Sequence, residues 1–379
     1  MRVAVLGGGL VGGVMAKDLG RDSEFQVTVA DVSATALRRL EGVPGITTVR
    51  ADLSDAGAIR RVVDGHDLVV GAVPGHMGFA TLKAVIEAGK SVVDISFFPE
   101  DALSLDALAR RHGVCAVVDC GVAPGCSNLI LGRMETHFDQ VDRFVCYVGG
   151  LPAVRTWPWE YKAPFSPSDV LEEYTRPARY VAAGQMVTMP ALSEAELVEF
   201  PEVGTLEAFN TDGLRSLLVT VKVPFMIEKT MRYPGHIEKI RVLRASGFFG
   251  TEPIEVGGVR VKPLDVTSRL LFPSWQFGPG EEDLTAMRVI VEGSKEGRRL
   301  RRGFEMVDRF DRSTGTTSMA RTTGFTCTAG VRLVAQGLWE RKGVSPPEFI
   351  GREPRCYDFI MADLAKRGVV FQETTTPLG

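Results

Sequence analysis

Three glycines and one aspartate near the start of the chain have the spacing of a dinucleotide-binding site. Gly7, Gly9 and Gly12 form a G-x-G-x-x-G motif, and Asp31 follows 19 residues after the last of them. Glycines in this pattern permit a tight turn, let the backbone approach a pyrophosphate and let the next helix pack closely on its strand. Free N–H groups at the start of that helix, together with the helix dipole, then face the anion. A carboxylate accepts hydrogen bonds from ribose hydroxyls and repels a 2′-phosphate, so Asp31 favours NAD over NADP.

The elements that must position these residues are six apolar segments separated by helical ones. The predicted strands are residues 3–6, 27–30, 46–50, 68–73, 92–95 and 114–118. Nearly continuous apolar runs are typical of parallel strands that are buried on both faces, and the helical segments supply the crossovers between them. The pattern therefore predicts an α/β fold in which residues 1–125 form a doubly wound, parallel-sheet Rossmann domain.

In such a sheet, ligands bind beyond the carboxyl ends of the strands, so these ends give the remaining candidates. The residues expected to contact the cofactor are Gly7, Gly9, Leu10, Val11, Gly12, Asp31, Asp52, Leu53, Ala72, Val73 and Pro74. Asp94 and Asp119 follow the fifth and sixth strands. Each of these two aspartates either lines the active cleft or caps a loop.

Residues 126–317 change to mostly strand-like segments, among them a hairpin predicted over 285–292 and 299–310 and a strand over 219–223. This pattern predicts an α+β domain with a mainly antiparallel sheet, which we expect to bind substrate and to form a homodimer or higher homo-oligomer. The loop 149–167 is rich in Gly, Pro and aromatic residues. It either covers a site or packs locally.

The last part of the chain, residues 318–379, is expected to return to the Rossmann domain. It contains a long helix of small residues over 318–338, a second helix over 357–366 and a short strand over 369–372. The sequence therefore predicts three regions, residues 1–125, 126–317 and 318–379.

Composition excludes several classes of function. Of the 379 residues, 45% are hydrophobic and 24% charged, and the net charge of −3 gives no electrostatic reason for binding nucleic acid or an anionic membrane. The six cysteines contain no C-x-x-C pair and the five histidines have no ligand spacing, so no metal site is expected. No apolar run is long enough to span a membrane. We expect a cytoplasmic enzyme.

Four further motifs carry a family resemblance. They are DCGVAPG at 119–125, GGLP at 149–152, GTLEAFNTDG at 204–213 and RYPGH at 232–236. With these motifs the chain resembles the saccharopine dehydrogenase-like family, and within it the lysine 6-dehydrogenases. The resemblance implies NAD-dependent oxidation of the ε-amino group of L-lysine, with release of ammonia and formation of allysine, which cyclises. The alternatives are a saccharopine-forming or saccharopine-cleaving enzyme, or a catalytically silent NAD-binding scaffold.

Amine oxidation needs a proton acceptor, because a lysine ε-amine with a pKa of about 10.4 is charged at neutral pH. His236 has a suitable intrinsic pKa and lies in a family motif, although a single histidine is as often a packing residue. Asp94 and Asp119 compete with it for this role. The other polar candidates are Arg232 or Arg176 for the substrate carboxylate, Glu160 or Asp212 for the α-ammonium group, and Tyr161 and Lys162 on the aromatic loop.

Overall fold

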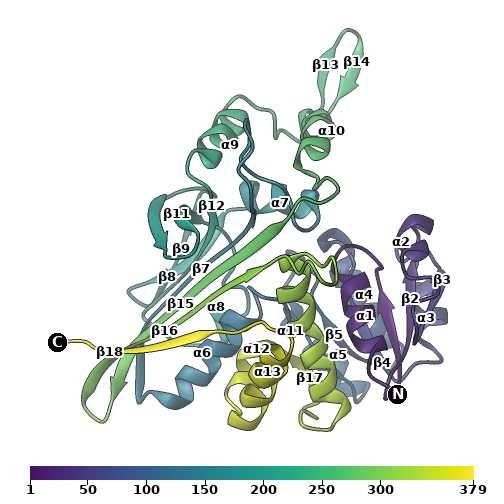
Figure 1. The fold of residues 1–379 in the computed structure, drawn as a ribbon, viewed down its shortest axis with the longest axis horizontal. Helices are drawn as coiled ribbons and strands as arrows, with labels where there is room; N and C mark the ends of the chain where they lie inside the picture. Colours follow the sequence, from purple (N-terminus) through teal and green to yellow (C-terminus); the bar gives the residue numbers. More distant parts are fainter.

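The computed structural model describes residues 1–379, and its N-terminal part is a seven-stranded parallel sheet (Figure 1). The strand order is β17-β6-β5-β4-β1-β2-β3, with every neighbouring pair parallel. The strands are β1 Arg2–Leu6, β2 Gln26–Asp31, β3 Ile46–Arg50, β4 Leu68–Gly71, β5 Ser91–Asp94, β6 Cys115–Val117 and β17 Gly343–Ser345. The six predicted strands are thus confirmed. The seventh, β17, comes from the C-terminal part of the chain.

Helices connect these strands as crossovers. They are α1 Gly12–Gly20, α2 Ala34–Arg38, α3 Ala56–Val63, α4 Gly75–Glu87, the 3-10 helix η1 Ala102–Leu105 and α5 Asp106–Arg111. Three of them begin at a polar cap: Ser33 Oγ accepts from the backbone N–H of Ala36, the Asp55 carboxylate from residues 57 and 58, and the Asp101 carboxylate from Leu103. Such caps satisfy N–H groups that a helix start leaves without partners.

The second sheet has nine strands and is mainly antiparallel, as predicted. Its order is β10-β11-β12-β7-β15-β16-β18, with β8 and β9 attached beside β12, and only β12 and β7 pair in parallel. The strands are β7 Gln140–Pro152, β8 Ala178–Ala182, β9 Gln185–Met189, β10 Glu196–Phe200, β11 Gly204–Asn210, β12 Phe225–Arg232, β15 Asp283–Lys295, β16 Arg298–Arg309 and β18 Gln372–Pro377.

The predicted hairpin is confirmed by β15 and β16, but two strand predictions are wrong. The segment 219–223 begins in the short helix α8, Leu217–Thr220, where Leu217 is buried under the sheet. The final strand starts at Gln372 instead of ending there, because its partner β16 pairs with residues 372–377.

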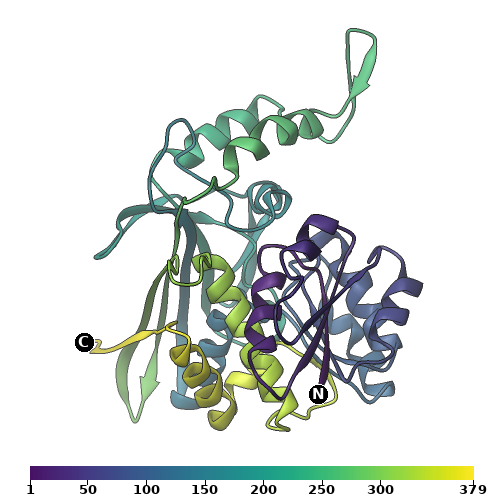
Figure 2. The same cartoon turned by 45° about the vertical axis from the view of Figure 1, so that its right-hand side comes forward.

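Helix α11, Ser318–Ala335, joins the two sheets, lying between the N-terminal sheet and the hairpin in both views (Figures 1 and 2). Arg332 donates to the carboxylates of Asp18, at 2.9 Å, and Asp22, at 2.7 Å, while Thr328 donates to Asp18 at 2.6 Å. The close approach depends on Gly324, where a Cβ would lie 3.2 Å from the side chain of Met15. The C-terminal part thus packs against α1.

The remaining elements surround the second sheet. They are α6 Cys126–His137, α7 Pro167–Thr175, α9 His236–Ala245, α10 Pro263–Trp275, α12 Pro347–Gly351, α13 Pro354–Lys366 and the hairpin of β13 Ile254–Val256 with β14 Val259–Val261. That hairpin projects from the body beside α10 (Figures 1 and 2). No helix combines the length and the apolar character needed to cross a membrane.

Candidate active site

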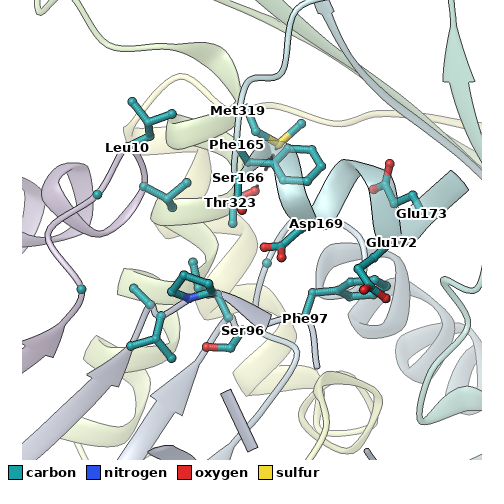
Figure 3. Close-up of a pocket in the computed structure, with 18 of the residues that line it drawn as sticks. Leu10, Ser96, Phe97, Phe165, Ser166, Asp169, Glu172, Glu173, Met319 and Thr323 are labelled. Atoms are coloured by element: carbon teal, nitrogen blue, oxygen red, sulfur yellow. Dashed lines mark hydrogen bonds between the residues drawn. The ribbon is translucent and has the colours of Figure 1, made fainter. Parts of the chain in front are cut away.

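A cavity of about 580 Å³ lies where the carboxyl ends of the parallel strands face the second sheet. It runs from the glycine loop to α7 and β12, and Figure 3 shows Leu10 at one end and Glu172 and Glu173 at the other. All eleven residues expected to contact the cofactor line it. A cavity at this edge is where a doubly wound sheet binds ligands.

The glycine loop is shaped to leave its backbone open to a ligand. Gly7 has a φ of +107°, and a Cβ there would overlap the carbonyl of Ala72. A Cβ on Gly12 would overlap the carbonyl oxygen of Gly7, whereas a Cβ on Gly9 would meet nothing within 4 Å. The backbone N–H groups of residues 9–12 have no acceptor within the chain. Free N–H groups at a helix start form an anion site, so the loop fits a pyrophosphate.

Asp31 lies at the end of β2, in the cavity wall beside this loop. Its Oδ2 accepts from the N–H of Gly8 at 2.7 Å and its Oδ1 from the N–H of Ser33 at 2.7 Å. These bonds fix the carboxylate while leaving lone pairs for ribose hydroxyls. Arg50 is its register partner on β3 and donates through Nε to the carbonyl of Val32.

The far end of the cavity carries more acids than bases. Its ionisable residues beyond the cofactor loop are Asp169, Glu172, Glu173, Arg176, Asp212, Glu228 and Arg232. Of these, Arg176, Asp212 and Arg232 were among the candidates. The other acids were not: Asp169, Glu172 and Glu173 lie on α7, and Glu228 lies in β12. A glutamate inside the otherwise apolar start of β12 was a signal in the sequence. The acids of α7 gave none, because charges along a helix usually face solvent.

Arg232 lines the cavity, but most of its N–H groups already have acceptors. Nη2 donates to Glu173 at 2.9 Å, Nε to the hydroxyl of Tyr174 at 3.1 Å and Nη1 to the carbonyl of Met231 at 2.9 Å. Only 2% of the residue is exposed. A bidentate clamp by Arg232 on a substrate carboxylate would have to displace Glu173.

Arg176 also lines the cavity and has donors to spare. Its Nη2 donates to Glu172 at 3.2 Å, its guanidinium lies 4.9 Å from the ring centre of Phe97, and its Nη1 is buried without an acceptor. A buried guanidinium nitrogen without a partner costs free energy unless a ligand supplies one. Of the two predicted arginines, Arg176 is therefore the one the structure leaves able to bind a carboxylate.

Glu228 is the complementary case. It lies on β12, lines the cavity and is 4% exposed, and its Oε2 has no hydrogen-bond donor. Burial, reinforced by the nearby charges of Glu173, Asp212 and Asp119, raises the pKa of this carboxyl to about 8. The cavity thus contains two buried polar atoms that lack hydrogen-bond partners, the Oε2 of Glu228 and the Nη1 of Arg176.

His236 is not in the cavity wall, and the expectation that it serves as the proton acceptor is wrong. Its Nδ1 lies 2.8 Å from the carbonyl of Trp159 and must donate to it, so Nε2 accepts from the hydroxyl of Tyr174 at 2.9 Å. Burial, with the charge of Arg232, lowers the pKa of the ring to about 3. The ring is fully buried, and both nitrogens are occupied, so His236 supports Arg232 through Tyr174.

Asp94 and Asp119 lie behind the cavity wall, and they too do not fit the predicted role of proton acceptor. Asp94 accepts from the N–H and hydroxyl of Ser96, at 2.8 and 3.2 Å, and burial raises its pKa to about 8. Asp119 forms a buried ion pair with Arg215 at 3.2 Å, which also donates to the carbonyl of Phe98. These aspartates hold the loops after β5 and β6 in place, and the Asp119 pair ties the two sheets together.

Three of the other predicted substrate contacts lie outside the cavity and one is already paired. Tyr161 is buried beside His236, Lys162 donates to Glu281 at 2.6 Å, and Glu160 binds Arg155. Asp212 does line the cavity, but both of its oxygens accept from one arginine, Arg179.

One part of the aromatic loop, residues 149–167, packs locally and another part covers the site. Trp159 packs edge-on against Trp275, with ring centres 6.3 Å apart, which is local packing. Phe165 and the next two residues instead line the cavity, and Figure 3 shows Phe165 in its wall together with Met319 of α11. The end of the loop therefore covers the site.

Comparison with known proteins gives matches over both parts of the chain. Residues 3–117 match the family model described as the saccharopine dehydrogenase NADP binding domain, and residues 121–369 match the saccharopine dehydrogenase C-terminal domain. The NADP(+)-dependent, L-glutamate-forming saccharopine dehydrogenase of Schizosaccharomyces pombe is 23% identical, over 98% of each chain. Carboxynorspermidine synthase of Vibrio cholerae is 22% identical over 93% of each. The apo saccharopine dehydrogenase (L-Glu forming) of Saccharomyces cerevisiae has the same fold, with a TM-score of 0.81 at 20% identity and 99% coverage of both chains.

Proposed function

The chain belongs to the saccharopine dehydrogenase family of oxidoreductases, and we propose that it is an NAD-dependent dehydrogenase that oxidises the ε-amino group of L-lysine. The products are ammonia and allysine, which cyclises. The observation that carries the proposal is the pair of unsatisfied groups in one cavity, the Nη1 of Arg176 and the Oε2 of Glu228. An amino acid supplies both missing partners, a carboxylate for the first and an ammonium group for the second.

Charge favours a basic substrate over a tricarboxylate. Five carboxylates and two arginines line the cavity beyond the cofactor loop, and Arg232 is already bonded to Glu173. Saccharopine has three carboxylates, each of which needs a donor in place of water. Lysine has one carboxylate and two ammonium groups, which suits a cavity with an excess of acid. The named activity of the Schizosaccharomyces pombe relative keeps saccharopine as the second candidate.

The residues of the chain hold the cofactor and enclose the reaction. The N–H groups of residues 9–12 would bind the pyrophosphate, and Asp31 the adenosine ribose. When bound, a nicotinamide ring supplies the hydride acceptor. Phe165 and Met319 would exclude water from the cavity, and Arg176 would hold the substrate at its far end.

Asp31 supports NAD as the cofactor, although the matching family model and the Schizosaccharomyces pombe relative carry NADP in their names. A 2′-phosphate would lie against a carboxylate held by two backbone N–H groups. Arg50, next to Asp31 in the sheet, is the cation that would oppose this repulsion. Titration with both cofactors decides between the two forces.

The function is tested by incubating the protein with NAD or NADP and each of L-lysine, saccharopine and L-norleucine, which lacks the ε-amino group. We expect the reduced-nicotinamide absorbance to appear with NAD and lysine, in equal amount to released ammonia. Turnover of saccharopine without ammonia would replace the first candidate by the second. Tight NAD binding without turnover of any substrate would refute both and indicate a scaffold.

A further inference from the structure

Glu228 occupies an unusual position for an ionisable side chain. It lies in the middle of β12, its register partner on β7 is Cys146, and its Oε1 packs against Gly213, which has no room for a Cβ. The side chain is thus held between a central strand and the loop after β11, with one oxygen fully buried and unbonded.

The three carboxylates whose charges act on Glu228 each have a cation. The pairs are Glu173 with Arg232, Asp212 with Arg179, and Asp119 with Arg215. An unpaired buried carboxylate is costly, and proteins keep such groups mainly at functional sites. Glu228 also lines the cavity, so a ligand can reach the side chain that the protein leaves without a partner.

We propose that Glu228 receives the reacting ammonium group of the substrate and accepts one of its protons. This deepens the proposed function and rests on it. In the step, one N–H bond of the ammonium breaks and an O–H bond forms on Glu228, leaving a neutral amine and a neutral carboxylic acid. No oxidant takes part, and the amine gains the lone pair that it needs to form a C=N bond when the hydride leaves.

The surroundings make this transfer easier than it would be in water. The charges facing Glu228 are those of Glu173 on α7, Asp212 after β11, Asp119 after β6 and Arg215 before α8, with the thiol of Cys146 on β7. Burial and the three acids raise the pKa of Glu228 to about 8, against the weaker opposing charge of Arg215. Burial lowers the pKa of an amine, so the two pKa values approach each other and the proton can be shared.

Activity against pH tests the proton step. We expect kcat/KM of the wild type for lysine to rise with pH to a plateau, with a midpoint near pH 8. Glu228→Gln keeps the shape of the side chain but cannot accept the proton. The value of kcat/KM should therefore fall by about 100-fold or more, and its rise with pH should disappear. Glu228→Asp keeps a carboxylate and should keep the rise at reduced kcat. The control is Glu305→Gln, which removes a partly exposed carboxylate that is paired with Arg288 across β15 and β16 of the second sheet.

Binding tests the ammonium site without any need for turnover. The affinities of L-lysine and L-norleucine are compared on the NADH-bound protein at about pH 8.5, above the pKa of Glu228. The wild type should prefer lysine by about tenfold or more, and Glu228→Gln should lose this preference without losing affinity for NADH. The same loss in Glu305→Gln would contradict the inference.

The outcomes separate the two proposals. Absence of lysine turnover refutes the proposed function, while the lysine preference and its loss in Glu228→Gln still establish the ammonium site. Turnover by Glu228→Gln within about threefold of the wild type, with an unchanged pH midpoint, overturns the role of Glu228. A wild type without preference for lysine over norleucine overturns it as well.

Discussion

Replacing Gly9 with alanine should weaken cofactor binding without weakening the fold. A methyl group at this position meets no protein atom within 4 Å, so it enters only the space in front of the glycine loop. In that space a pyrophosphate would lie against the N–H groups of residues 9–12. A displaced diphosphate loses charge-assisted hydrogen bonds, and we expect the Kd for NAD to rise by about 100-fold, which is roughly 2.7 kcal/mol.

Two neighbouring glycines give matched controls. A Cβ on Gly12 would overlap the carbonyl of Gly7, so Gly12→Ala should lower both the Tm and the affinity. Gly13 lies inside α1, and its Cβ would make ordinary contacts, 3.4 Å from the carbonyl of Gly8. Gly13→Ala should therefore keep the affinity and raise stability by about 0.5–1 kcal/mol, the helix propensity difference.

The assay combines thermal unfolding with titration of NADH fluorescence on the three variants. If Gly9→Ala binds as tightly as the wild type while its Tm is unchanged, the pyrophosphate does not lie at this loop. The assignment of the cofactor end of the cavity would then fail, whatever the activity of the protein.

Four further changes test other parts of the structure. Asp31→Ser removes the carboxylate facing the ribose, so the affinity for NADP relative to NAD should rise by about tenfold or more in fluorescence titrations; an unchanged ratio would show that the carboxylate does not set cofactor choice. Glu228→Gln should raise the Tm more at about pH 8.5 than at about pH 5. The folded protein keeps the Glu228 proton up to about pH 8, whereas the unfolded chain releases it near pH 4.5. The free energy of unfolding of the wild type therefore falls by up to roughly 4–5 kcal/mol as the pH rises between these values. Asp119→Ala leaves Arg215 buried without a counter-charge and should cost about 3–5 kcal/mol in urea unfolding, part of which Arg215→Met should restore. His236→Ala should lower the free energy of unfolding by about 2–4 kcal/mol and leave the pH midpoint of kcat/KM in place; a shifted midpoint would return His236 to the reaction.

The cofactor half of the molecule could be predicted because its elements are local in the sequence. A strand, a glycine turn and a helix follow one another within residues 2–20, and Asp31 ends the very next strand. Parallel strands buried on both faces leave continuous apolar runs, so six of the seven strands were visible. The seventh, β17, is three residues long and joins the sheet from more than 200 residues away, which no local pattern reveals.

Most of the substrate half could not be predicted because its residues converge from separate elements. Arg176, which follows α7, was a candidate, but the sequence did not show that Glu228 in β12 and Phe165 near the end of the aromatic loop line the same cavity. His236 was a candidate because of its motif, but it has a packing role, since its Nε2 accepts a hydrogen bond from the hydroxyl of Tyr174. A motif shows that a residue type matters at its position, but it does not distinguish contact with substrate from support of a residue that makes the contact.

The network behind Arg232 shows why that distinction decides the assignment of the base. The guanidinium donates to Tyr174, which donates to His236, which donates to the carbonyl of Trp159. Each donor in this series of hydrogen bonds has one acceptor. Protonating His236 would therefore leave the Tyr174 hydroxyl facing an N–H and would place a second buried cation near Arg232. Both effects lower the pKa of the histidine, as its buried position already does. A group held neutral for structural reasons cannot also cycle its proton in turnover. Glu228 is the cavity-lining carboxyl that has a fully buried oxygen without such a bond.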